Sequence, residues 1–243
     1  MQELISIVIP FYNDHDHIAQ TIQSIANQTY PNLEVIITDD GSTPSLSEAA
    51  IVDMLKGRDE QHQLNTNVQF QYQKNAGAPT ARNNGRSLTT GEYLIFWDAD
   101  IMAKPEFIQK MHNVLTLHPE VDYAYCSYKL GNKEMTGKKF SIDTLKQQNY
   151  IPTTSLIRTE KALLWDESLK RFQDWDLWLR MAKEGSIGIF VPEVLFIAAP
   201  ESGISNWLPS FAYKSPWRYL PQFKKKVEAY ERAKAIIQKK HNI

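Results

Sequence analysis

The chain has 243 residues, 42% of them hydrophobic, with a formal net charge of −1. This size suits one large globular domain, and no apolar run is long enough to predict a membrane-spanning helix. A single cysteine, Cys126, excludes an internal disulfide bond and indicates a reducing compartment. Because the polar start, Met1 to Glu3, is unlike a secretory signal peptide, we expect a cytoplasmic protein.

In chain order, the first hundred residues alternate between strand and helix signals. Apolar runs predict strands over residues 4–9, 33–37 and 93–97, and the alternating pattern of residues 68–72 predicts another. Helix patterns follow after residue 14, within 45–63 and from about residue 79. This alternation is typical of an α/β fold, with a mostly parallel central sheet and helices on both faces.

The second half is less regular. We expect a helix near 105–117, a strand near 121–128 and an amphipathic helix that begins near Asp174, with Trp175 and Trp178 packed in the core. No linker rich in Gly, Ser or Pro divides the chain. The sequence therefore predicts one domain, residues 1–205, followed by an aromatic and basic C-terminal tail, residues 206–243.

The tail differs in charge from the rest of the chain. Residues 214–243 contain nine Lys or Arg and two Asp or Glu, a net +7, which leaves 18 against 26, a net −8, in residues 1–213. An acidic body is poorly suited to binding nucleic acid. Aromatic residues beside lysines in 207–243 suit peripheral binding to an anionic membrane, on its inner face. The alternative is a helix that packs back on the domain with a solvated basic face.

Polar motifs follow four of the expected strands, at residues 10–13, 39–42, 74–77 and 98–100. The C-terminal ends of parallel strands share one edge of the sheet, which is where such folds bind ligands. In the last motif, Asp98 and Asp100 flank one residue, so both carboxylates can reach a hard cation such as Mg²⁺ or Mn²⁺ that also holds a diphosphate. An acid pair alone after a strand is more often a turn or a helix cap.

Five segments together resemble family 2 glycosyltransferases of the GT-A fold, in the same order and spacing. They are VIPFYN (8–13), IITDDGS (36–42), NAGAPTARN (75–83), DAD (98–100) and QDWDLWLR (173–180). The resemblance extends from about residue 4 to 198. It implies a nucleotide-sugar-binding half, residues 1–100, and an acceptor-binding half, residues 101–205.

The resemblance also implies roles for individual residues. The donor-binding residues would be Pro10, Phe11, Tyr12, Asp40, Gly77, Arg82, Asp98 and Ala99. Asp40 would accept a hydrogen bond from the nucleobase, and Arg82 would lie near the base or diphosphate. Asp98 would touch the ribose and, with Asp100, form the Mn²⁺ or Mg²⁺ site. Asp174 would be the catalytic base.

The residue types agree with an inverting transfer of one sugar, of hexosyltransferase type. A divalent cation can offset charge on the leaving diphosphate, and a carboxylate can take the proton of an acceptor hydroxyl. One base without an enzyme nucleophile implies a single displacement with inversion. We expect a UDP-linked donor and a saccharide or lipid-linked saccharide acceptor, in surface polysaccharide or glycolipid synthesis.

Several features leave alternatives open. Gln173 stands where the family usually has Glu, and Asp174 can be the N-cap of the following helix, where backbone amides would favour its ionised form. Asp176 is then a second candidate base. We expect His15 and His17 to be solvated. The competing functions are a non-catalytic nucleotide-sugar-binding scaffold and a sugar nucleotidyltransferase, although the latter would need a Gly-rich turn with Arg after the first strand.

Overall fold

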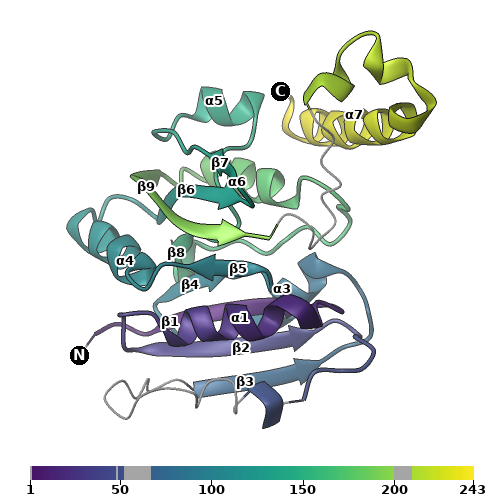
Figure 1. Ribbon diagram of the computed structural model, residues 1–243. Helices are drawn as coiled ribbons and strands as arrows, with labels where there is room; N and C mark the ends of the chain where they lie inside the picture. Colours follow the sequence, from purple (N-terminus) through teal and green to yellow (C-terminus); the bar gives the residue numbers. More distant parts are fainter. Residues whose placement is uncertain (1, 48, 52–66, 200–209) are drawn as a thin grey trace.

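The computed structural model describes residues 2–47, 49–51, 67–199 and 210–243. In these ranges nine strands form one sheet, in the order β3-β2-β1-β4-β8-β6-β9-β5, with β7 beside β6 (Figure 1). The strands are β1 Ile5–Phe11, β2 Leu33–Asp39, β3 Asn67–Tyr72, β4 Tyr93–Phe96, β5 Ile101–Ala103, β6 Tyr123–Leu130, β7 Lys133–Met135, β8 Leu156–Arg158 and β9 Gly188–Ala198.

The helices lie on both faces of this sheet, as the sequence predicts. They are α1 His15–Ala26, α3 Ala78–Arg86, α4 Phe107–Leu117, α5 Ile142–Gln147, α6 Gln173–Lys183 and α7 Pro221–His241, with short 3₁₀ turns η1 Thr159–Lys161, η2 Ser210–Tyr213 and η3 Trp217–Tyr219. The helix expected within 45–63 lies mostly outside the described residues. Of this range the structure describes residues 45–47 and 49–51, and residues 49–51 are helical.

The N-terminal strands are parallel, and β1, β2 and β4 are buried on both faces, whereas β3 at the edge is only partly buried. β1 pairs in parallel with β2 and β4, and β2 pairs with β3. Along β1, Ile5, Ile7 and Ile9 belong to one hydrophobic core and Val8 to the other. This double burial explains why β1, β2 and β4 read as nearly continuous apolar runs in the sequence, whereas the partly buried β3 alternates.

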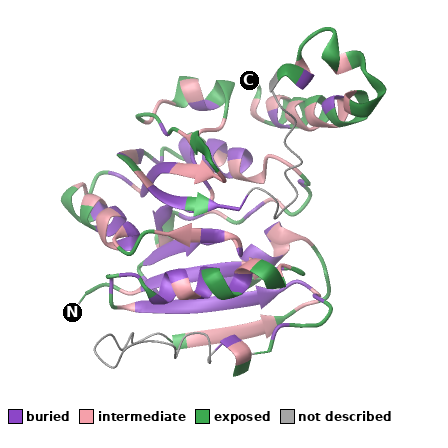
Figure 2. Ribbon diagram, in the orientation of Figure 1, coloured by how far each residue is buried: buried purple, intermediate pink, exposed green. Residues whose placement is uncertain are grey.

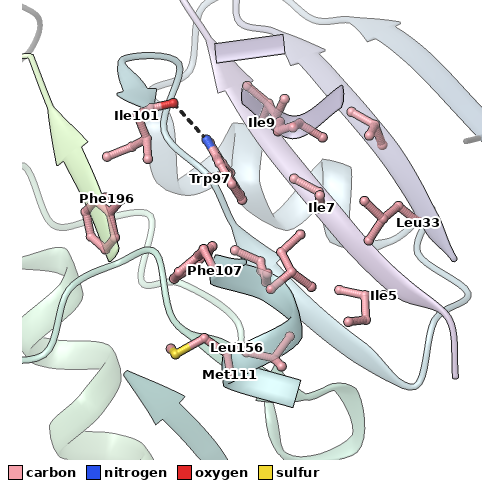
Figure 3. Close-up of a cluster of buried hydrophobic side chains, with 14 of the residues drawn as sticks. Ile5, Ile7, Ile9, Leu33, Trp97, Ile101, Phe107, Met111, Leu156 and Phe196 are labelled. Atoms are coloured by element: carbon pink, nitrogen blue, oxygen red, sulfur yellow. Dashed lines mark hydrogen bonds between the residues drawn. The ribbon is translucent and has the colours of Figure 1, made fainter. Parts of the chain in front are cut away.

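The first core lies between the sheet and helices α1 and α4, and Figure 3 shows part of it. Trp97, directly after β4, is fully buried there and donates its indole N–H to the carbonyl of Ile101 at 3.1 Å. This bond closes the short turn that contains Asp98 and Asp100. Packing in the first core therefore fixes the backbone of the acidic motif.

The second core, on the opposite face, contains most of the apolar side of α6. Trp175 and Trp178 are 2% and 0% exposed, which confirms the expected core packing. On the same side α3 lies close to the sheet at Gly85, where an added Cβ would be 2.5 Å from Cγ1 of Val8. Glycine is therefore required for α3 to approach β1 this closely.

The second half of the sheet is mixed. β8 is antiparallel to β4 and β6, β5 is antiparallel to β9, and β6 is parallel to β9. The largely parallel α/β fold with helices on both faces is confirmed, and the antiparallel strands enter where the sequence is less regular. This pairing places β5, which directly follows Asp100, against the end of β9, where the amide of Ala199 donates to the carbonyl of Asp100 at 3.1 Å.

The C-terminal segment lies away from the strands, and the end of α7 approaches α6 (Figure 1). Phe211, Trp217, Tyr219 and Leu220 are exposed, whereas Ile237, near the end of α7, is fully buried in the second core. The end of α7 thus packs back on the domain, as one of the two expectations for the tail predicted. Among the helices of the described ranges, none has the length and apolar character needed to cross a membrane.

Candidate functional site

The expected polar edge exists. The register places Phe11 opposite Asp39 and Asp39 opposite Tyr72, so β1, β2 and β3 end side by side. Of the residues expected beside a nucleotide, Tyr12 is 53% exposed and Pro10 is partly buried. The side chain of Phe11 is fully buried in the first core, so any ligand contact from it would come from its main chain.

Asp39 and Asp40 both organise loops at this edge. Asp39 accepts the amides of Ser42 and Leu46 at 2.8 and 2.9 Å. Asp40 is 3% exposed and accepts from Gln73 Nε2 at 2.7 Å and from the amides of residues 76 and 77 at 2.8 and 2.9 Å. Its carboxylate thereby fixes the turn before α3, in which Gly77 has φ +96°.

Arg82 connects the polar edge of the sheet to α6. Its guanidinium is nearly buried and donates from Nη2 to Asp98 Oδ1 at 2.6 Å. Nη1 lies 3.4 Å from Oε1 of Gln173, and the guanidinium carbon lies 4.4 Å from the ring centroid of Trp165. The Gln173 amide also donates to the carbonyl of Leu169 at 2.9 Å. A neutral amide fits this position because it must both accept and donate.

The acidic pair lies in the turn between β4 and β5. Asp98 is one-third exposed and paired with Arg82. Ala99 packs in the first core, and its carbonyl accepts from the hydroxyl of Thr21 at 2.6 Å. On α1, Nδ1 of His17 lies 2.5 Å from Oδ1 of Asp14. This hydrogen bond raises the pKa of His17 although burial acts to lower it, and the charge of Asp100 adds to the increase. His15 is exposed, as expected, whereas His17 is partly buried and bonded to Asp14.

The donor set of Asp98 and Asp100 fits a hard divalent cation only in part. Across the described ranges, no three His, Cys, Asp or Glu side chains are grouped so that they could hold a metal ion. Mg²⁺ and Mn²⁺ are, however, commonly held by one or two carboxylates together with substrate phosphates and water. Two carboxylates at the strand end are compatible with such a shared site.

Asp174 lies in the first turn of α6 and is partly buried. Its Oδ2 accepts from Asn149 Nδ2 at 2.7 Å, and Oδ1 accepts from the amide of Trp175 at 2.9 Å. Burial raises the pKa of Asp174 above its ordinary value, against the opposing effects of the Trp175 amide, the Arg82 charge and Asn149. Burial therefore outweighs the hydrogen bonds that favour the ionised form.

Two expectations about α6 are wrong. Asp174 is not the N-cap, because the helix begins one residue earlier and Phe172, with φ 57°, occupies the cap position. Asp176 is not placed as a spare base, because it is fully buried and held by Arg180, Lys240 and His241. Burial acts to raise the pKa of Asp176, but these hydrogen bonds outweigh it and hold the pKa below its ordinary value.

Two residues of this region gave no signal in the sequence. Asn149 lies in a polar stretch without periodicity, and its contact with Asp174 depends on tertiary folding. Tyr128 looks like an ordinary strand residue, and its ring stacks on Phe196 with centroids 4.9 Å apart. Burial raises the pKa of Tyr128 to about 12, and the charges of Asp174 and Asp98 contribute to the increase.

Comparison with known proteins agrees with this geometry. The sequence model described as Glycosyl transferase family 2 matches residues 6–174. Glycosyltransferase GlyG of Streptococcus pneumoniae serotype 4 is 28% identical over 236 residues, covering 84% of this chain and 73% of its own. An uncharacterized glycosyltransferase of Haemophilus influenzae is 32% identical over 189 residues, covering 74% and 72%.

Solved structures share the fold at low sequence identity. S. aureus TarS 1-349 in complex with UDP-GlcNAc has a TM-score of 0.68 at 19% identity, over 85% of this chain and 62% of that one. Mannosyltransferase PcManGT from Pyrobaculum calidifontis, in complex with GDP-Man and Mn²⁺, has a TM-score of 0.61 at 16% identity, over 97% and 65%. The chain thus spans less than two thirds of either solved protein.

The family match includes the polar edge and ends at Asp174. The chain belongs to glycosyl transferase family 2.

Proposed function

We propose that this chain is an inverting, metal-dependent glycosyltransferase that moves one sugar from a UDP-linked donor to a hydroxyl of a saccharide or lipid-linked saccharide. The observation that supports this most strongly is the Arg82 bridge. It joins Asp98, an expected ribose contact and metal ligand, to Gln173, the residue before Asp174 in α6. A donor site and a base must be adjacent for a displacement reaction, and this bridge brings the two candidates together.

Asp174 has the properties of a general base for the acceptor hydroxyl. Asn149 and the Trp175 amide fix the orientation of its carboxylate. Its raised pKa increases the proton affinity of the ionised form, which favours proton abstraction near neutral pH. With Asp174 acting as base rather than as nucleophile, the sugar is displaced once, and an α-linked donor gives a β-linked product.

Asp98 and Asp100 would hold Mn²⁺ or Mg²⁺ together with the donor diphosphate. Such an ion, when bound, offsets the negative charge that develops on the leaving diphosphate. Arg82 keeps Asp98 in one orientation through the 2.6 Å hydrogen bond and places a fixed positive charge near the same position. The UDP complexes of TarS and the Mn²⁺ complex of PcManGT support this choice of ligands by analogy of fold.

Donor binding should depend on the metal through Asp100. In calorimetry with UDP-GlcNAc, we expect Mn²⁺ to tighten binding to the wild type by about tenfold or more relative to EDTA, because the cation bridges protein and diphosphate. Asp100→Asn should lose most of this gain. Asp143→Asn, at an exposed acid of α5, is the matched control and should keep it. Equal binding of the wild type with Mn²⁺ and with EDTA would contradict the metal site.

Removing the Asn149 hydrogen bond should shift the pH dependence of turnover. Because this bond favours the ionised form of Asp174, Asn149→Ala should raise the pKa of Asp174 further. The acid limb of kcat, measured as hydrolysis or transfer from UDP-GlcNAc, should then move to higher pH. Gln148→Ala, at the exposed neighbour, should leave the limb in place. A limb that stays fixed or moves to lower pH in Asn149→Ala would argue against Asp174 as the base.

The start of the C-terminal segment supports peripheral attachment to an anionic membrane, where a lipid-linked acceptor would be found. Phe211, Trp217 and Tyr219 are 46%, 47% and 66% exposed and lie next to Lys214 and Arg218 in sequence, a region that is largely green in Figure 2. The lysines at 224–226 are also exposed on α7. Aromatic rings and basic side chains together suit the interface of an anionic bilayer.

Liposome flotation tests this attachment. The protein should float with vesicles that contain phosphatidylglycerol and stay unbound with phosphatidylcholine alone, because each basic residue near an anionic surface contributes about 1 kcal/mol. Trp217→Ala, and separately the replacement of Lys224, Lys225 and Lys226 by Gln, should weaken flotation. Leu117→Ala, which removes an exposed apolar residue from α4, should not. Failure to float at low salt would refute the membrane proposal.

A further inference from the structure

The last turn of α7 supplies two partners for a buried carboxylate of α6. Nζ of Lys240 lies 2.6 Å from Oδ1 of Asp176, and Nε2 of His241 lies 2.8 Å from the same oxygen. The other oxygen is held by Nε of Arg180 at 2.8 Å. The Asp176 side chain is fully buried, so without the end of α7 its charge would lose two of these three partners.

Lys240 also holds the loop that carries Trp165. Its Nζ lies 2.5 Å from Oδ2 of Asp166, and this hydrogen bond is the main cause that lowers the pKa of Asp166 to about 2. The adjacent Trp165 is fixed on its other side by Asn83, which accepts from the Trp165 amide at 2.8 Å and donates to its carbonyl at 3.0 Å. The Trp165 ring in turn packs against the guanidinium of Arg82. One lysine therefore binds both α6, at Asp176, and Asp166, the chain neighbour of the tryptophan that packs on Arg82.

Apolar packing and a helix cap fix the position of this turn. Ile237 is fully buried in the second core, and Ile243 packs against the same core. The helix ends at Asn242, which has φ 54°, and the amide of Ile243 then donates to the carbonyl of Gln238 at 3.0 Å. This is the geometry of a Schellman cap, which defines where a helix stops. The last turn thus has a defined structure, and its charged groups are held in place.

We propose that Lys240 and His241, together with Asp166 and Asp176, form a C-terminal latch that positions the acceptor side of the active site. The proposal rests on the proposed function, because it takes Asp174 as the base. Asp176 lies two residues from Asp174 in the first turn of α6, and Asp166 lies next to Trp165, which contacts Arg82. The latch thereby fixes the two segments that hold the base and the Arg82 bridge.

Lys240 and His241 are positioning residues, because they do not touch the candidate site themselves. They bind Asp166 and Asp176, which lie one residue from Trp165 and two residues from Asp174 in the chain. Removing Lys240 leaves Asp176 with fewer compensating charges and releases Asp166, so the segment 163–178 should become less ordered. Small displacements of a base lower the rate of the chemical step much more than they lower donor affinity, because the reacting atoms must be aligned. The candidate donor-binding residues at the ends of β1, β2 and β4 lie outside the latched segments, and Arg82 on α3 keeps its 2.6 Å bond to Asp98 without Lys240. Donor affinity should therefore change much less than the rate.

Lys240→Met, compared with Lys239→Met, tests the latch. Both changes remove one charge from an exposed position of α7, but the contacts with Asp166 and Asp176 belong to Lys240. By hydrogen exchange, Lys240→Met should speed exchange in segment 163–178 and leave β1 and β2 unchanged. With Mn²⁺ and UDP-GlcNAc as the probe, kcat should fall by about tenfold while the donor Kd changes by less than about twofold. Lys240→Arg should restore part of the rate.

Two results would overturn the latch. The first is an exchange pattern in 163–178 that is the same for Lys240→Met and Lys239→Met. The second is faster exchange there with no loss of kcat. If Lys240→Met does not fold, Asp166→Asn replaces it, because this variant leaves the buried Asp176 paired with Lys240. Asp166→Asn should produce the same changes in exchange and rate, but smaller ones. An exchange pattern in 163–178 that stays unchanged in Asp166→Asn would overturn the proposal. A wild type that neither binds nor turns over any nucleotide sugar would contradict the proposed function instead, since the exchange comparison is independent of turnover.

Discussion

A nearly buried guanidinium joins the two halves of this molecule. Arg82 donates to Asp98 after β4, lies within hydrogen-bond range of Gln173 on α6 and packs on Trp165. A buried cation costs several kcal/mol unless it is paired, so the fold is stable only with these partners close together. The close approach of α3 to the sheet, which Gly85 allows, puts Arg82 within reach of all of them. The candidate active site therefore depends on the packing of α3.

The sequence predicts this edge of the sheet well for a simple physical reason. Strands buried on both faces appear as uninterrupted apolar runs, and parallel strands end at the same side of the sheet. The positions of Asp40 and of the Asp98 and Asp100 pair followed from chain direction alone. The family resemblance then added Arg82 and Asp174, which no local pattern marks as functional. The structure brings Asp98, Arg82 and the start of α6 together.

What the sequence could not predict depends on contacts between distant segments. The prediction that Asp174 caps α6 is wrong because Phe172, in a left-handed conformation, occupies the cap position. Nothing in the residue type of Phe172 indicates this conformation. Burial of Asp174, its bond to Asn149 and the enclosure of Asp176 by the end of α7 come from tertiary packing. The side chain of Phe11 belongs to the core although the resemblance implies a ligand contact. Charge counting revealed a basic tail but not which of its lysines reach the domain.

The most direct test of this account is the turnover of Asp174→Asn with a donor that the wild type is shown to bind. The amide keeps the shape of the carboxylate but cannot take a proton, so the account predicts that kcat falls by about 10²- to 10⁴-fold while donor affinity stays within about twofold of wild type. Turnover within about threefold of the wild type would contradict the assignment of Asp174 as the base and, with it, the proposed reaction.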